Sequence, residues 1–219
     1  RNLVPVTLEL GGKSPVLISR TADIKTAISR IMLGKTMNAG QICLAPDYLM
    51  VPEEQLDEVV AEIEAIVAQM YPSLLANPQY TSVVNVRHFQ RLSDNVRDAR
   101  EKGGEVIEVN PAGEDFASQQ GTYKIPPTII KNATDDMRVL EEEIFGPLLP
   151  IKTYKDFNET IDYVNSKPRP LAVYYFGRDS TEERNVLDRT TSGGVCLNDV
   201  IMHIMQEDLP FGGVGPAGT

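Results

Sequence analysis

The 219-residue chain is poor in the residues that cross-link or metallate small proteins. It contains two cysteines, two histidines and no tryptophan. Two cysteines in a chain of this length do not form a disulfide framework, and neither Cys43 nor Cys196 has the CxxC partner or the His/Cys spacing of a zinc site. We therefore expect no metal site, and the low use of cysteine favours a reducing, cytoplasmic compartment.

Basic charge is also scarce, with 21 Lys and Arg against 31 Asp and Glu and a net charge of −10. Such a surface repels phosphate backbones and anionic lipids, which argues against binding of nucleic acid or of membrane surfaces as the main role. No apolar run approaches the ~20 residues of a membrane-spanning helix, and the N-terminus lacks the pattern of a secretory signal. With 42% apolar residues, the chain can bury the core of one domain.

Short apolar runs alternate with helical patterns along the chain. Strands are expected at 6–10, 15–19, 47–51, 105–109, 125–130, 148–154, 171–177 and 193–199. Helical spacing is found from 23 to the 34–40 region and at 52–72, 85–101, 157–164 and 180–189, where Ser180 and Glu183 have capping-box spacing. Two prolines restrict 125–130 to an edge or irregular strand. The alternation predicts an α/β fold, a three-layer α/β/α domain with a largely parallel sheet.

Cys43 lies in MNAGQICLAP (37–46), in irregular backbone between a predicted helix and a predicted strand. A free cysteine is often a small buried hydrophobe, but loops also present reactive groups, and the local context gives both interpretations equal weight. Cys196 is expected to pack within a strand. A reactive thiol needs a partner such as histidine, but His88 and His203 lie in no recognisable turn, and we interpret both as structural.

Glu9 follows an apolar run and directly precedes Leu10 and two glycines. A carboxylate at the end of a strand can have its pKa raised by partial burial and can then act as a general base near neutral pH. Spacing alone favours a surface glutamate.

Four segments together resemble the aldehyde dehydrogenase superfamily, and they extend over nearly the whole chain. They are LELGGKSP (8–15), NAGQICLAP (38–46), EEEIFGPLLPI (141–151) and LPFGGVG (209–215). The first holds the family's Glu and the second its nucleophilic Cys, with the 34-residue separation expected in that family. CLAPDYLMVP and LNDVIMHIMQEDLPFGGVG resemble its class 3 branch, which handles fatty and aromatic aldehydes, and within it the coniferyl aldehyde dehydrogenases.

The resemblance implies oxidation of an aldehyde to its acid with NAD or NADP, through a thioester on Cys43. Glu9 corresponds to the base that activates water for deacylation. Glu143 and Phe145 match contacts to the ribose and ring of the nicotinamide cofactor, and Phe211 matches a position near the aldehyde channel. Simple packing explains either phenylalanine as well. The family forms homodimers or homotetramers.

No GxGxxG follows a predicted strand, and the family's dinucleotide-binding domain precedes its Glu motif. We therefore expect 1–219 to be an excised catalytic domain, without the N-terminal NAD-binding domain and the C-terminal tail, and inactive alone. Two alternatives stay open: a Cys-dependent thiol hydrolase, and a non-catalytic interaction domain that retains the fold.

Overall fold

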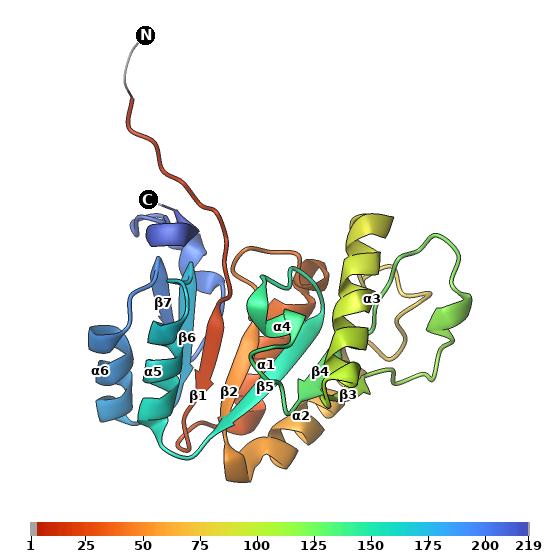
Figure 1. Ribbon diagram of the computed structural model, residues 1–219, viewed down its shortest axis with the longest axis horizontal. Coiled ribbons are helices and arrows are strands. Elements are labelled where there is room, and N and C mark those ends of the chain that lie inside the picture. Colours follow the sequence, from red (N-terminus) through yellow and green to blue (C-terminus); the bar gives the residue numbers. More distant parts are fainter. Residues whose placement is uncertain (1–3, 219) are drawn as a thin grey trace.

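A seven-stranded sheet runs through the computed structural model, which describes residues 4–218 (Figure 1). The strands are β1 (Pro15–Ile18), β2 (Tyr48–Pro52), β3 (Glu105–Glu108), β4 (Thr128–Lys131), β5 (Leu148–Tyr154), β6 (Ala172–Phe176) and β7 (Gly194–Leu197). Their spatial order is β3-β4-β5-β2-β1-β6-β7. Only β3 is antiparallel to its neighbour among these strands, so the prediction of a largely parallel sheet is confirmed.

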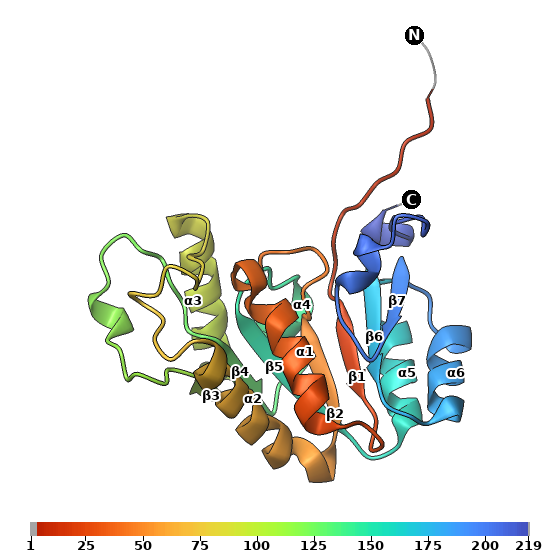
Figure 2. The ribbon, with the colours of Figure 1, turned by 180° about the vertical axis from the view of Figure 1, so that it is seen from behind.

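Helices cover both faces of this sheet. Helices α1 (Ile24–Thr36) and α2 (Leu56–Met70) lie on the face seen in Figure 2, and α3 (Val86–Glu101), α4 (Arg138–Glu141), α5 (Phe157–Ser166) and α6 (Ser180–Arg189) lie on the other. Successive residues of β1 point to opposite faces, so Val16 and Ile18 join one apolar cluster and Leu17 joins the other. Parallel sheets need this double cover, and the three-layer α/β/α prediction is confirmed.

Short 3-10 turns complete the described chain. They are η1 (Met37–Gly40), η2 (Glu53–Gln55), η3 (Phe116–Ser118), η4 (Met202–Met205) and η5 (Gly215–Ala217). Within residues 4–218, no helix has the combination of length and apolar character that crossing a bilayer requires.

The start of α6 differs from the predicted capping box. The N-cap is Asp179, whose side chain accepts hydrogen bonds from the N–H groups of Thr181 and Glu182 at 2.8 and 3.1 Å. Ser180 is therefore the first helical residue rather than the cap. The prediction from Ser180 and Glu183 was wrong because the aspartate one residue earlier supplies the better acceptor.

Strand β4 is not an edge strand, so the first of the two alternatives for 125–130 was wrong, and the proline-containing part of that range lies outside the regular strand. It pairs with β3 on one side and β5 on the other. Pro126 and Pro127 precede the strand, which begins at Thr128, so neither has to donate to the ladder. The carbonyl of Pro127 instead accepts from Val109 N–H at 2.8 Å.

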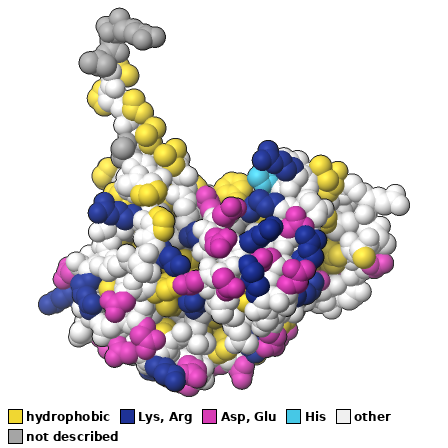
Figure 3. Space-filling view, viewed as in Figure 1, with side chains coloured by type: hydrophobic (Ala, Val, Ile, Leu, Met, Phe, Trp, Pro, Cys, Tyr) yellow, Lys and Arg dark blue, Asp and Glu magenta, His cyan; other side chains and the backbone are white. Residues whose placement is uncertain are grey.

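The segment 6–10 does not form the predicted strand. Its apolar side chains are 41–67% exposed, and apolar atoms run along the projecting N-terminal segment in Figure 3. Its backbone contacts are an isolated bridge from Glu9 to Gly218 and hydrogen bonds to the C-terminal segment, from Leu10 N–H to the Ala217 carbonyl at 2.8 Å and from Gly213 N–H to the Leu8 carbonyl at 3.3 Å. Alternation fits a strand, but a strand also needs a neighbour, and residues 4–218 supply none of sufficient length.

Candidate active site

Three of the predicted motifs meet at the amino ends of adjacent parallel strands. Residues 9–14 precede β1, residues 43–47 precede β2 and residues 143–146 precede β5, and these strands are neighbours in the order β5-β2-β1. Equivalent ends of parallel strands lie at one edge of a sheet, here the upper edge in Figure 1. Ligands in open α/β sheets usually bind at the opposite, carboxyl edge. In this chain the candidate site instead lies at the amino edge, and the loops that precede β1, β2 and β5 form it.

The backbone before Cys43 is strained. Asn38 and Ala39 in η1 have left-handed φ values of 51° and 54°, and Gly40 follows with φ 71°. Each left-handed non-glycine residue costs about 1–2 kcal/mol. Gly40 is required here, since a Cβ atom would lie 2.4 Å from the carbonyl oxygen of Gly146. Such strain clusters at functional sites, and here it brings the cysteine turn against the loop that carries Glu143.

Gln41 fixes the same turn from inside. Its side chain is buried and donates from Nε2 to the carbonyls of Asn38 and Ser82 at 2.9 and 3.0 Å. Its Oε1 accepts from Val84 N–H at 2.8 Å. All three hydrogen bonds are internal, so the turn that presents Cys43 is held rigidly.

Cys43 is half-buried, and its thiol lies within the electrostatic influence of two carboxylates. Burial raises the pKa of the Cys43 thiol, and the charges of Glu143 and Glu9 raise it further. The backbone N–H groups of Cys43 and Leu44 oppose this rise. The thiol is consequently neutral near pH 7, and a base must remove its proton before it can attack a carbonyl.

The two carboxylates lie in different environments. Glu9 is exposed, as its spacing alone favoured, because few neighbours cover residues 4–10; the alternative of a partly buried carboxylate is not seen in the described structure. Glu143 is half-buried, and burial raises the pKa of its carboxyl group to about 7, against the effect of the Gly12 N–H. A Cβ atom on Gly11, whose φ is +80°, would lie 2.8 Å from the Glu143 carboxylate. The glycine pair therefore lets this carboxylate approach the backbone.

The two phenylalanines are placed differently. Phe145 has a left-handed φ of 46° and is 37% exposed, so it is not a core residue of the described chain. Phe211 is half-buried against the apolar cluster that also packs Cys43. Its ring lies 6.2 Å from that of His203. The segment after Phe211 bonds to the Glu9 segment, from Gly213 N–H to the Leu8 carbonyl at 3.3 Å, which brings the fourth motif to the same edge.

Neither histidine is among the groups that shift the pKa of the Cys43 thiol. His88 lies in α3, and His203 lies beside the rings of Tyr174 and Phe211, where burial lowers the pKa of its imidazole. Cys196 lies half-buried in β7 and packs against the core, as predicted. Residues 4–218 contain no cluster of His, Cys, Asp and Glu suited to a metal ion.

Sequence reasoning missed two buried charged residues under the site. Lys35 is 1% exposed, and burial lowers the pKa of its ammonium group to about 7, against the charge of Asp47. A signal existed, since Lys35 follows Ile31 by four residues on the apolar face of α1. Asp47 is 3% exposed and directly precedes β2, where an apolar residue would fit the strand pattern better.

Replacing Glu143 with glutamine is expected to make Cys43 more reactive toward iodoacetamide. The change removes a negative charge that, after burial, contributes most to raising the pKa of the thiol, so the thiolate fraction at pH 7.5 rises. Alkylation rates between pH 6.5 and 10, followed by mass spectrometry, test this. The exposed Glu142→Gln is the matched control and should react like the wild type. A slower reaction of Glu143→Gln at every pH would contradict the assigned electrostatics.

Comparison with known proteins agrees with the four motifs. The profile of the Aldehyde dehydrogenase family matches residues 1–219. The coniferyl aldehyde dehydrogenase of a Pseudomonas species is 61% identical over 217 residues, covering 99% of this chain and 45% of that protein. Aldehyde dehydrogenase family 3 member A2 of Mus musculus is 41% identical over 220 residues, covering 100% of this chain and 43% of that protein. The resemblance to the class 3 branch is thus confirmed.

Solved structures agree with the fold. Staphylococcus aureus AldH in a substrate-bound state aligns with a TM-score of 0.89 at 37% identity, covering 99% of this chain and 45% of the other. An NADP-dependent glyceraldehyde-3-phosphate dehydrogenase from Bacillus halodurans, complexed with NADP, aligns at 0.85 and 30% identity, covering 100% and 44%. The chain spans less than half the length of these relatives. It belongs to the aldehyde dehydrogenase family.

Proposed function

We propose that the intact protein oxidises an aldehyde to its carboxylic acid with a nicotinamide cofactor, through a thioester on Cys43. One observation carries this proposal. The strained turn before β2 presents a half-buried thiol, and the carboxylates of Glu9 and Glu143 both act on it. Two carboxylates that influence the thiol suit a reaction in which one base deprotonates the sulfur and a base later activates water.

The chemistry follows from these groups. A carboxylate removes the thiol proton, and the Cys43 sulfur adds to the aldehyde carbonyl to give a hemithioacetal. The N–H groups of Cys43 and Leu44 favour negative charge at the sulfur, and we propose that they also donate to the oxyanion. After oxidation, Glu9 takes a proton from water, which attacks the thioester carbonyl and releases the acid and the free thiol.

The residues beside Cys43 fit a nicotinamide nucleotide. The Glu143 carboxylate can accept hydrogen bonds from vicinal ribose hydroxyls, and the exposed Phe145 ring can pack against a planar group. Held by Glu143 and Phe145, the nicotinamide would supply the hydride acceptor for oxidation at the hemithioacetal carbon. We infer that the main dinucleotide-binding surface lies outside 1–219, and that this chain contributes the nucleophile and base.

The named relatives suggest the substrate class. A 61% identical relative is called a coniferyl aldehyde dehydrogenase, and a 41% identical one belongs to family 3. We propose an aromatic aldehyde such as coniferyl aldehyde, with fatty aldehydes as the alternative. A homodimer or homotetramer is proposed from the family alone.

Steady-state assays of the intact protein test the function. Coniferyl aldehyde and a long-chain aliphatic aldehyde are each supplied with NAD or NADP, and the reduced cofactor is followed at its absorbance band. We expect turnover of at least one aldehyde, with the matching acid as product. The 219-residue chain alone, assayed alongside, should give no turnover. Failure of the intact protein with every pair would overturn the proposal.

A further inference from the structure

Asp47 is a buried carboxylate that the proposed chemistry does not use. It lies four residues after Cys43, at the start of β2, and only 3% of it is exposed. Its backbone N–H donates to the Ser14 carbonyl at 2.9 Å, which fixes it against the start of β1. A carboxylate in such a place costs free energy unless both oxygens have partners.

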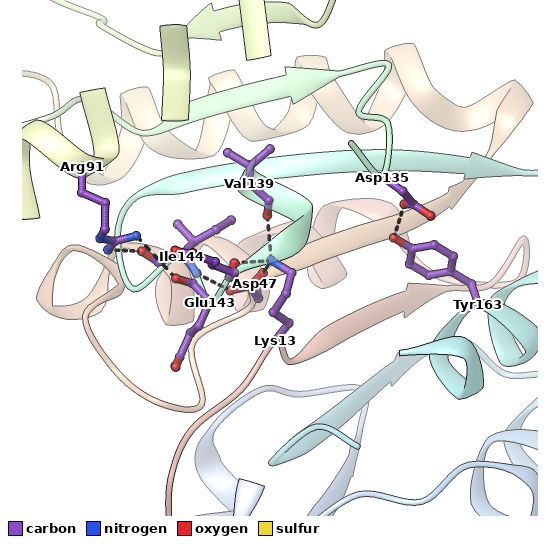
Figure 4. Close-up of polar contacts among 9 residues, drawn as sticks. Lys13, Asp47, Arg91, Asp135, Val139, Glu143, Ile144 and Tyr163 are labelled. Atoms are coloured by element: carbon purple, nitrogen blue, oxygen red, sulfur yellow. Dashed lines mark hydrogen bonds and ion pairs between the residues drawn. The ribbon is translucent and has the colours of Figure 1, made fainter. Parts of the chain in front are cut away.

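The two oxygens of Asp47 hold two different motif segments. Oδ1 forms an ion pair with Nζ of Lys13, which directly follows the glycine pair that contacts Glu143. Oδ2 accepts a hydrogen bond from Ile144 N–H at 2.9 Å. Ile144 lies between Glu143 and Phe145, so this bond fixes the backbone of both predicted cofactor residues (Figure 4).

The loop 139–146 is tied at several further points. Lys13 Nζ also donates to the carbonyls of Val139 and Glu142, at 2.7 and 2.9 Å. From the other side, Arg91 in α3 donates from Nη2 to the Ile144 carbonyl at 2.6 Å (Figure 4). Asp47 is the centre of this arrangement, because it anchors Lys13 and also bonds to the loop directly.

We propose that Asp47 is the positioning residue that fixes the 139–146 loop, and with it Glu143 and Phe145, relative to Cys43. The left-handed backbone of Phe145 persists only where neighbouring contacts hold it, and the bond to Ile144 N–H lies one residue away. Aspartate suits this place because it has two acceptors and a charge for Lys13. Asparagine keeps one acceptor and loses the charge.

Hydrogen exchange tests the positioning directly. In Asp47→Asn of the intact protein, the peptide spanning 140–147 should exchange about 10-fold faster. The asparagine cannot both accept from Ile144 N–H and form an ion pair with Lys13. Asp135→Asn is the matched control. Asp135 pairs with Lys152 and with Lys167 at 3.1 and 3.3 Å, outside the loop, and its loss should leave this peptide unchanged.

A second readout concerns the cofactor and rests on the proposed function. A displaced loop should raise the KM for the nicotinamide cofactor by about 10- to 100-fold in Asp47→Asn. Cofactor-free hydrolysis of an activated ester and alkylation of Cys43 should change no more than in Glu143→Gln, since they need the thiol and feel the loop only through the Glu143 charge. A purely structural role would instead lower all of these activities together.

The outcomes separate the two proposals. If Asp47→Asn does not fold, Lys13→Gln removes the partly exposed partner of the same ion pair. Hydrogen exchange of the peptide 140–147 should then be faster in Lys13→Gln. Unchanged exchange at 140–147, or faster exchange throughout the core with proportional loss of every activity, overturns the positioning role. If hydrogen exchange in Asp47→Asn is faster at 140–147 alone, while the intact wild-type protein oxidises no aldehyde, the positioning role stands and the proposed function fails.

Discussion

Replacement of Cys43 by alanine is expected to reduce aldehyde oxidation by the intact protein by about 10⁴-fold or more in kcat. Without the sulfur no hemithioacetal forms, and an aldehyde has no tetrahedral form ready to donate hydride. Cys196→Ala is the matched control, because Cys196 is also half-buried with a pKa raised by burial, yet it lies in β7 and packs against the core. Its replacement should leave kcat within about 3-fold.

Steady-state rates of the two variants, with thermal unfolding as the check on folding, decide the assignment. Equal residual activity of Cys43→Ala and Cys196→Ala, with both proteins folded, would remove Cys43 as the nucleophile. Full activity of Cys43→Ala would favour the non-catalytic interpretation of this turn.

Replacement of Glu9 by glutamine is expected to slow the steady state by about 10²- to 10⁴-fold while preserving a first turnover. Glutamine cannot take a proton from water, so the thioester should accumulate after one equivalent of cofactor is reduced. Stopped-flow absorbance should therefore show a burst followed by near-arrest. Glu64→Gln, an exposed glutamate on α2, is the control and should show the wild-type time course.

The same experiment separates the roles of the two carboxylates at Cys43. If Glu9 serves deacylation and Glu143 serves the cofactor, Glu143→Gln should slow the burst itself and raise the cofactor KM. A normal steady state in Glu9→Gln, with the burst and arrest appearing in Glu143→Gln instead, would assign the deacylating base to Glu143. Glu143 is half-buried and the pKa of its carboxyl group is about 7, which suits a general base. Deacylation by Glu143 instead of Glu9 is therefore the alternative that this experiment tests.

Local patterns predicted most elements, since apolar periodicity and punctuation by Gly and Pro are local signals. The neighbour relations were not predictable in the same way. Nothing in the spacing of 15–19, 47–51 and 148–154 says that β5, β2 and β1 lie side by side, because pairing of distant strands depends on packing across the whole sheet. The failed strand at 6–10 shows the same limit, since alternation alone does not supply a partner.

The roles of Cys43 and Glu9 were predicted from the resemblance to the family and not from the physical properties of the residues. From the residues alone, Cys43 could equally be a packing residue or a reactive thiol. Glu9 was interpreted as a surface residue, and it is exposed in the described chain. Only the resemblance to the family indicated that Cys43 and Glu9 act in one site. Asp47 and Lys35 were missed because a buried charge is recognised by its partners, and those partners lie in other segments of the chain.

The most direct test of the account is the location of the covalent intermediate. Glu9→Gln of the intact protein is mixed with coniferyl aldehyde and cofactor, quenched in acid, digested and mapped by mass spectrometry. We predict a mass increase equal to the acyl group on the peptide that contains Cys43, and none on the peptide that contains Cys196. An acyl group on any other residue, or acid product formed with no acylated Cys43 at any time point, would contradict it.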